Sequence, residues 1–88
     1  MAMHYKYSSH AEFQIKERDI SKKTIHNVLQ KPGQIIKGKH NRFVLQSILR
    51  SKGQDQLIRV ICQNYPEDTV VITAYITTKI SKYWENRL

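Results

Sequence analysis

From Gln34 onward the chain alternates between apolar and polar residues, and this alternation constrains the fold more than any other feature of the sequence. A period of two is typical of a β-strand that packs one face and leaves the other open. It predicts strands over residues 34–37, 42–50, 56–64 and 69–78. The connections between them are short and rich in turn formers, which favours consecutive antiparallel hairpins.

Two helices are predicted before the alternation begins. Ser9 and Glu12 have the spacing of a capping box, so a first helix is expected to run to about Arg18. Ser21 repeats the N-cap role, and apolar residues at i, i+3 and i+4 predict a second amphipathic helix over residues 22–30. A Pro-Gly pair then ends this helix.

Residues 5–7 add a short first strand, so the predicted order is β-α-α-β-β-β-β. This order predicts an α+β fold, in which two N-terminal helices pack on one face of a curved antiparallel sheet. The 88 residues suffice for one small domain, residues 1–88. A core this small favours association, a homodimer included.

The alternation also predicts which side chains face the helices and which face away from them. In the last strand it assigns an apolar set to the helix side: Val70, Ile72, Ala74 and Ile76. The opposite, open face is expected to carry a half-polar set from three strands: Arg42, Gln46, Arg50, Arg59, Val71, Thr73, Tyr75 and Thr77. Arginines and a tyrosine on an open sheet face are suited to bind a phosphate backbone.

The charge of the chain points to a polyanionic partner. Fifteen Lys and Arg stand against seven Asp and Glu, which gives a net charge of +8. Cys62, the single cysteine, excludes an internal disulfide and favours a reducing, cytoplasmic location. The sequence contains no apolar run long enough for a membrane span, so no membrane association is expected.

Most kinds of catalytic site are excluded because the sequence lacks the motifs that they require. The acidic residues and histidines lack the spacing of metal ligands, and there is no glycine-rich phosphate loop or serine elbow. We therefore expect neither a metal nor a cofactor. Metal-independent RNA cleavage needs only a base, an acid and cations that hold the charge of the phosphorane.

The residues suited to that chemistry are Arg59 and Arg42 as the phosphate clamp, and His10, Tyr75, Lys79 and Tyr83 as candidates for proton transfer. Each has a plainer interpretation. His10 suits a helix-start residue that packs on the sheet, Arg59 a surface ion pair, and Tyr75 a packing residue of the sheet.

The end of the chain interleaves cations and aromatic residues, with Lys82, Tyr83 and Trp84 in succession. Such a segment can stack bases while it binds phosphates. The alternative is a C-terminal turn in which Tyr83 and Trp84 close one end of the small core.

Six short motifs follow one another along about residues 5–84: Ser9-His10-Ala11, Lys16-Glu17-Arg18-Asp19-Ile20-Ser21, Arg42-Phe43-Val44-Leu45-Gln46, Leu57-Ile58-Arg59-Val60-Ile61, Val70-Val71-Ile72-Thr73-Ala74-Tyr75 and Lys82-Tyr83-Trp84. In their order and spacing the sequence resembles domain-of-unknown-function family 4258. The family is similar to the RelE/ParE and BrnT toxins, which are small basic domains that cleave RNA or otherwise stall the cell. The resemblance implies two helices packed on a curved antiparallel sheet, and a neighbouring antitoxin that neutralises the domain.

The family pattern marks six residues of this chain: His10, Arg18, Arg42, Arg59, Tyr75 and Tyr83. Two positions depart from it. Gln14 stands where the family often has Arg, and Asp19 replaces the usual Gly.

Our leading hypothesis is a toxin of a type II toxin-antitoxin system, a metal-independent ribonuclease that cleaves RNA, free or on the ribosome, by attack of the 2′-hydroxyl. The residues assigned to catalysis are His10, Arg59, Tyr75, Lys79 and Tyr83. Those assigned to RNA and phosphate binding are Arg18, Arg42, Gln46, Arg50, Lys82 and Trp84. The alternatives are a non-catalytic module that binds nucleic acid or the ribosome, and a structural homodimer.

Overall fold

A computed structural model describes residues 5–86 of the chain. Its elements are β1 (Tyr5–Tyr7), α1 (Ser9–Glu17), α2 (Lys22–Gln30), β2 (Gln34–Lys37), β3 (Arg42–Ser51), β4 (Gln54–Asn64), β5 (Thr69–Thr77) and α3 (Ile80–Tyr83). The fold is α+β, and the predicted order of elements is confirmed as far as β5. The short helix α3 occupies the place where a turn was expected.

The five strands form one sheet in the order β1-β5-β4-β3-β2. The strands β2 to β5 form an antiparallel meander, but β1 pairs parallel to β5, so the sheet is mixed rather than antiparallel throughout. This pairing joins Tyr7 to Val71, and it continues as the backbone N–H of Ser8 donates to the carbonyl oxygen of Val71 at 3.0 Å. Alternation within a strand does not specify such a distant partner, which is why the sequence did not predict it.

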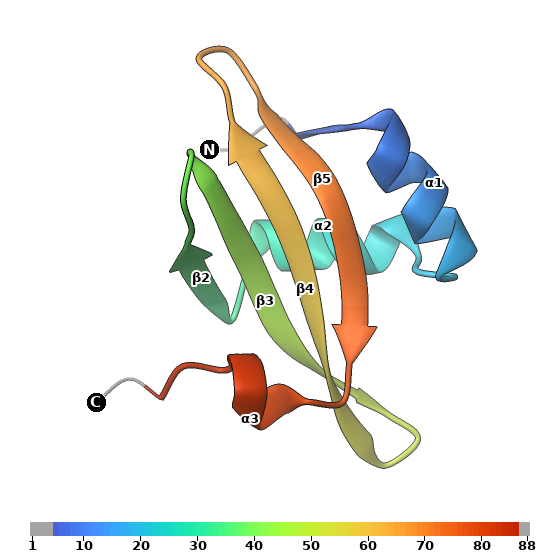
Figure 1. Cartoon of the computed structure of the whole chain (residues 1–88). Helices are drawn as coiled ribbons and strands as arrows, with labels where there is room; N and C mark the ends of the chain where they lie inside the picture. The colour runs from blue at the N-terminus through green and yellow to red at the C-terminus, as the bar shows by residue number, and fades with distance from the viewer. Residues whose placement is uncertain (1–4, 87–88) are drawn as a thin grey trace.

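Both long helices pack on the same side of the sheet. Figure 1 shows α2 behind the strands and α1 beside β5. The core between helices and sheet consists of twelve buried residues: Ala11, Ile15, Ile20, Ile25, Val28, Leu29, Leu45, Ile58, Val60, Cys62, Val71 and Ala74. Burial of each larger aliphatic side chain stabilises the fold by about 1.5–3 kcal/mol.

Cys62 belongs to this core. Its side chain is fully buried, and burial raises the pKa of the thiol to about 12. In this environment the cysteine acts as a small apolar residue.

The two helix starts differ in how well they were predicted. Ser21 caps α2 as expected, because its Oγ accepts a hydrogen bond from the backbone N–H of Thr24 at 3.0 Å. The N-cap of α1 is Ser8 rather than Ser9, and its Oγ accepts from the N–H of Ala11 at 3.0 Å. The N-cap was therefore predicted one residue too late in the chain. Glu12 forms an ion pair with Lys22 at 2.7 Å instead of completing a capping box.

The end of α1 explains one departure from the family pattern. Asp19 has a φ of 54°, in the left-handed region that favours glycine. This conformation lets the N–H of Ile20 donate back to the carbonyl oxygen of Ile15 at 3.0 Å, so that the chain turns into α2. Asp is among the residues that tolerate this conformation best after glycine.

A β-bulge in β5 changes which residues face the core. Ile61 lies opposite Thr73 and Cys62 lies opposite Val71, so Ile72 is an extra residue in β5. Val71 therefore faces the core, whereas Val70 lies opposite Gln63 on the open face. The predicted facing of Val70 and Val71 was wrong, because the bulge reverses the alternation at this point.

Within residues 5–86, the helices are too short or too polar to cross a membrane.

Candidate functional site

The sheet face turned away from α1 and α2 is the open face. Strand register places its side chains in four rows across β3, β4 and β5: Arg42, Gln63 and Val70; Val44, Ile61 and Thr73; Gln46, Arg59 and Tyr75; Ile48, Leu57 and Thr77. The polar residues gather in the row of Arg59, and α3 crosses in front of this end of the sheet (Figure 1).

Gln46 organises the row of Arg59. Its side chain is 0% exposed, and its Nε2 donates to Gln34 Oε1 at 2.8 Å and to the carbonyl oxygen of Tyr83 at 3.2 Å. Its Oε1 accepts from Nε of Arg59 at 2.9 Å. Because the donor and the acceptor groups of this buried amide are all hydrogen-bonded, Gln46 holds the guanidinium of Arg59 in one orientation.

Arg59 lies between two tyrosines. Its Nη1 donates to the hydroxyl of Tyr75 at 2.7 Å, and its Cζ is 4.2 Å from the ring centroid of Tyr83. The two aromatic rings meet edge to face, with centroids 6.2 Å apart and planes at 70°. Hydrogen bonds and cation–π contact thus hold a cation beside two phenol hydroxyls.

Tyr83 has the perturbed hydroxyl of this cluster. A hydrogen bond to Tyr75 lowers the pKa of Tyr83, with further lowering by Lys82 and by the positive charge of Arg59, while desolvation acts in the opposite direction. The Nζ of Lys82 lies 5.2 Å from the Tyr83 ring. Tyr83 therefore ionises at a lower pH than an isolated tyrosine.

Gln34, which the sequence analysis did not single out, holds the segment that carries Tyr83. Its Nε2 donates to the carbonyl oxygen of Glu85 at 2.5 Å, and its Oε1 accepts from the N–H of Glu85 at 3.0 Å. Gln34 is 8% exposed and pairs with Gln46 across β2 and β3. The signal in the sequence was a glutamine at the first position of a short strand, directly after Pro-Gly.

Trp84 fixes the same segment against β2. A Cβ atom on Gly33 would lie 3.0 Å from Cη2 of Trp84 and 3.2 Å from the carbonyl oxygen of Gln46. A larger residue at position 33 would therefore require the indole ring or the backbone to shift by a few tenths of an ångström. The half-buried Trp84 has the packing that the closing-turn interpretation expects.

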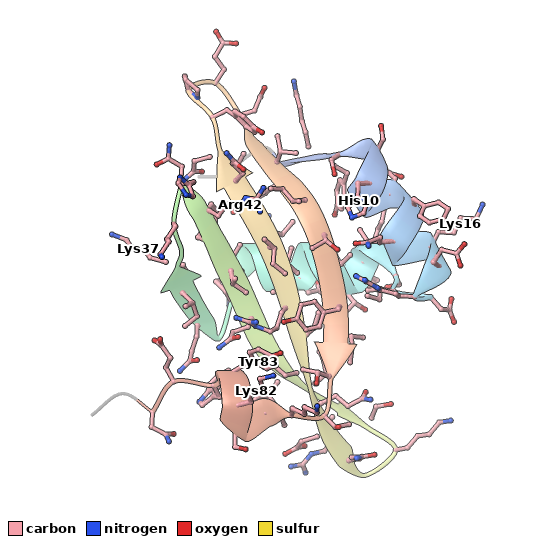
Figure 2. The ribbon with its side chains drawn as sticks, in the orientation of Figure 1. His10, Lys16, Lys37, Arg42, Lys82 and Tyr83 are labelled. Carbon is pink, nitrogen blue, oxygen red and sulfur yellow. The ribbon has the colours of Figure 1, made fainter. Side chains whose placement is uncertain are left out.

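The cluster thus unites five of the predicted residues: Gln46, Arg59, Tyr75, Lys82 and Tyr83. Figure 2 shows Tyr83 and Lys82 near one end of the sheet and Arg42 near the other. Arg42 is exposed, and its Nε donates to Gln63 Oε1 at 3.1 Å. Arg42 and Arg59 lie two rows apart on the open face, so the structure does not bring them together as the phosphate clamp that the sequence predicted.

The remaining predicted residues lie outside the cluster. Nη1 of Arg18 donates to Thr73 Oγ1 at 3.1 Å and to the carbonyl oxygen of Ala74 at 2.8 Å, at the outer edge of β5. Arg50 forms an exposed ion pair with Asp55 at 3.0 Å. His10 is exposed in the first turn of α1, far from Tyr83 in Figure 2.

Lys79 precedes α3, and its backbone N–H donates to Thr77 Oγ1 at 3.1 Å. Its side chain is exposed, and within residues 5–86 no hydrogen bond or ion pair joins it to the cluster. Gln14, the second departure from the family pattern, accepts a hydrogen bond from the hydroxyl of Thr73. Across residues 5–86, no three His, Cys, Asp or Glu side chains gather closely enough to hold a metal ion.

The fold and the cluster together define a small basic α+β protein. Its candidate site is cationic and aromatic, and it lies on the sheet face opposite the two long helices. The chain belongs to the family described as Domain of unknown function (DUF4258), whose model matches residues 7–76. That match includes Arg59 and Tyr75, whereas Lys82 and Tyr83 lie beyond it. Neither the comparison with curated proteins nor the comparison with solved structures gives a match.

Proposed function

We propose that this protein is a toxin-like, metal-independent endoribonuclease, related to the RelE/ParE and BrnT toxins. The observation that supports the proposal is the position of Arg59, bonded to Tyr75 at 2.7 Å and stacked 4.2 Å from the Tyr83 ring. A fixed guanidinium beside a phenol of lowered pKa has the chemistry that phosphodiester transfer requires.

In the proposed reaction the RNA 2′-hydroxyl attacks its own 3′-phosphorus. The Tyr83 phenolate takes the proton of the 2′-hydroxyl, and the guanidinium of Arg59 stabilises the charge that develops on the phosphorane oxygens. The bond from phosphorus to the 5′-oxygen breaks as Tyr75 or Lys82 donates a proton to that oxygen. The products are a 2′,3′-cyclic phosphate and a free 5′-hydroxyl.

The charge of the protein supports RNA as the substrate, because a net charge of +8 attracts a polyanion from any direction. The proposal also implies a cytoplasmic protein that an antitoxin restrains. An acidic segment of that partner, laid over Arg59 and Lys82, would neutralise the cations and exclude RNA.

A second candidate is a non-catalytic module that binds RNA or the ribosome through the same face. It is favoured by the internal bonds of Arg59, since Nε and Nη1 both already donate to protein groups and the Tyr83 ring covers one face. In this case Arg59 anchors the C-terminal segment, and affinity comes from the surrounding exposed cations. A structural homodimer is the third candidate carried from the sequence.

Expression in a bacterial host, with total RNA followed after induction, tests the proposal. The wild type should arrest growth and degrade RNA, and the Arg59→Ala/Tyr75→Phe double variant should do neither. Lys16→Ala, on the exposed side of α1, removes one positive charge without touching the cluster and should remain toxic.

Purified protein then separates catalysis from binding. Cleavage of RNA in the presence of a chelator, with cyclic phosphate ends, supports the ribonuclease. Intact RNA after incubation with soluble, folded wild-type protein that still binds RNA would establish the binding module instead.

A further inference from the structure

A second feature of the open face lies at the end opposite Tyr83. It is a hollow of about 590 Å³, lined by Gly38, Lys39, His40, Arg42, Val44, Ile61 and Gln63. Its size is within the range of sites that hold small ligands. None of the residues that line it is acidic.

The hollow combines an apolar floor with a cationic rim. Val44 and Ile61 are half-buried neighbours on β3 and β4, and they form the row next to that of Arg59. Lys39 and Arg42 lie at the rim and are exposed. An apolar surface beside guanidinium and ammonium groups suits a ligand that has both a flat apolar part and a negative charge.

The rim is built on a turn that its own hydrogen bonds hold in place. His40 and Asn41 both have left-handed backbone, with φ of 58° and 63°. Gly38 donates to the carbonyl oxygen of Arg42 at 2.8 Å, and the N–H of Asn64 donates to the carbonyl oxygen of Asn41 at 3.0 Å. The turn between β2 and β3 is therefore tied to β4, which reduces the entropy lost when a ligand binds.

Arg42 retains donors for a ligand. Its Nε donates to Gln63 Oε1, and within residues 5–86 this is the one hydrogen bond that its guanidinium makes. The two terminal nitrogens can therefore contact an anion, and Gln63 fixes the plane of the group from which they extend.

The hollow and the cluster lie on one continuous face. Gln63, opposite Arg42, is four residues along β4 from Arg59, a separation of about 13 Å at the rise of an antiparallel strand. A stacked nucleic-acid strand advances about 3.4 Å per nucleotide, so about four stacked nucleotides span this distance, and fewer when the strand is extended. The backbone positions of the two arginines are thus several stacked nucleotides apart.

We infer that the hollow is a nucleotide subsite for single-stranded RNA, with a base on Val44 and Ile61 and its phosphate on Arg42 and Lys39. The inference rests on the proposed function, since it assigns to the same RNA a second point of contact several nucleotides from Arg59. It makes the substrate a stretch of unpaired RNA rather than an isolated phosphodiester.

Binding of a cleavage-resistant strand tests the subsite independently of catalysis. The probe is a fluorescein-labelled 2′-O-methyl hexauridylate, in which the nucleophile is blocked. Arg42→Ala should weaken its binding about tenfold, as expected for loss of a charge-assisted hydrogen bond. The slope of log K against log salt concentration should fall by about 0.7, as expected for one lost phosphate contact to a single strand.

Lys16→Ala is the control of matched charge, because Figure 2 shows Lys16 on α1, away from Arg42. Methyl NMR spectra locate the bound strand: the signals of Val44 and Ile61 should shift on titration, and that of Ile76, on the helix side, should not. Equal effects of Arg42→Ala and Lys16→Ala, or unmoved Val44 and Ile61 signals, would overturn the inference.

The proposed function and the subsite fail in different ways. If the wild type cleaves unmodified RNA and Arg42→Ala binds the hexamer with unchanged affinity, the proposed ribonuclease activity is supported and the subsite is rejected. If the hexamer binds over Val44 and Ile61 but the wild type leaves unmodified RNA intact, the subsite is supported and the protein is a binding module.

Discussion

Replacement of Gln46 by leucine should destabilise the protein through loss of one buried amide. Gln46 is 0% exposed and exchanges three hydrogen bonds, with Gln34, with the Tyr83 carbonyl and with Arg59. The bond to the charged guanidinium contributes about 1.5–3 kcal/mol and each neutral bond about 1 kcal/mol. Leucine regains about 1–2 kcal/mol through apolar burial. The expected net loss in the free energy of unfolding is about 1.5–4 kcal/mol.

Urea denaturation, followed by far-ultraviolet circular dichroism, measures this loss. With an m-value of about 1–1.5 kcal/mol/M for a chain of this size, the midpoint should fall by about 2 M. The matched control is Gln63→Leu, which removes a half-buried glutamine on the same face whose partner Arg42 is exposed. This control should lose less than about 1 kcal/mol.

A second substitution tests the physical reason. If the loss arises because the guanidinium keeps an unsatisfied donor, then Gln46→Leu/Arg59→Leu should be more stable than Gln46→Leu alone. Equal losses for Gln46→Leu and Gln63→Leu, or strictly additive effects of Gln46→Leu and Arg59→Leu, would show that the buried amide and the guanidinium are not coupled in this way.

Four further predictions concern three other residues. Asp19→Gly should raise the free energy of unfolding by about 0.5–1 kcal/mol, because glycine adopts the φ of 54° without a Cβ, and Asp19→Ala should not, as thermal denaturation can compare. Gly33→Ala should push Trp84, the single tryptophan of the chain, out of its contact and shift its fluorescence emission to the red. Cys62 should react with thiol reagents at the rate of unfolding, since burial raises its pKa to about 12. Because that pKa is above the ordinary value of 9.0, Cys62 lowers stability as the pH rises from about 9 towards 12, and a Cys62→Ala variant should lose less stability over that range.

The parts of the fold that depend on local pattern could be predicted from the sequence. Ser21 and the spacing of the residues behind it predicted α2, and the alternation placed Arg59 and Tyr75 on one face. Their neighbourhood follows from strand register, because adjacent antiparallel strands bring paired residues together.

The parts that depend on distant contacts could not be predicted. Ile72 is one apolar residue among several in β5, and nothing local marks it as the extra residue of a bulge. Leu57 lies on the open face beside Thr77, yet it is 0% exposed, at the point where the chain leads into α3. The partnership of Gln34 with Glu85 spans 51 positions, and no period within a single element can encode it.

The parallel pairing of β1 with β5 sets an order in which the native structure can assemble. Tyr5 pairs with Thr69, so this contact closes a loop of most of the chain, whereas the β3–β4 hairpin pairs residues as close as Ser51 and Gln54. Because loop closure is opposed by entropy, we expect the hairpin to form early and β1 to dock only once β5 is in place. On this expectation the first strand of the sequence is among the last to join the sheet, and its amide hydrogens should exchange with solvent sooner than those at the centre of β4.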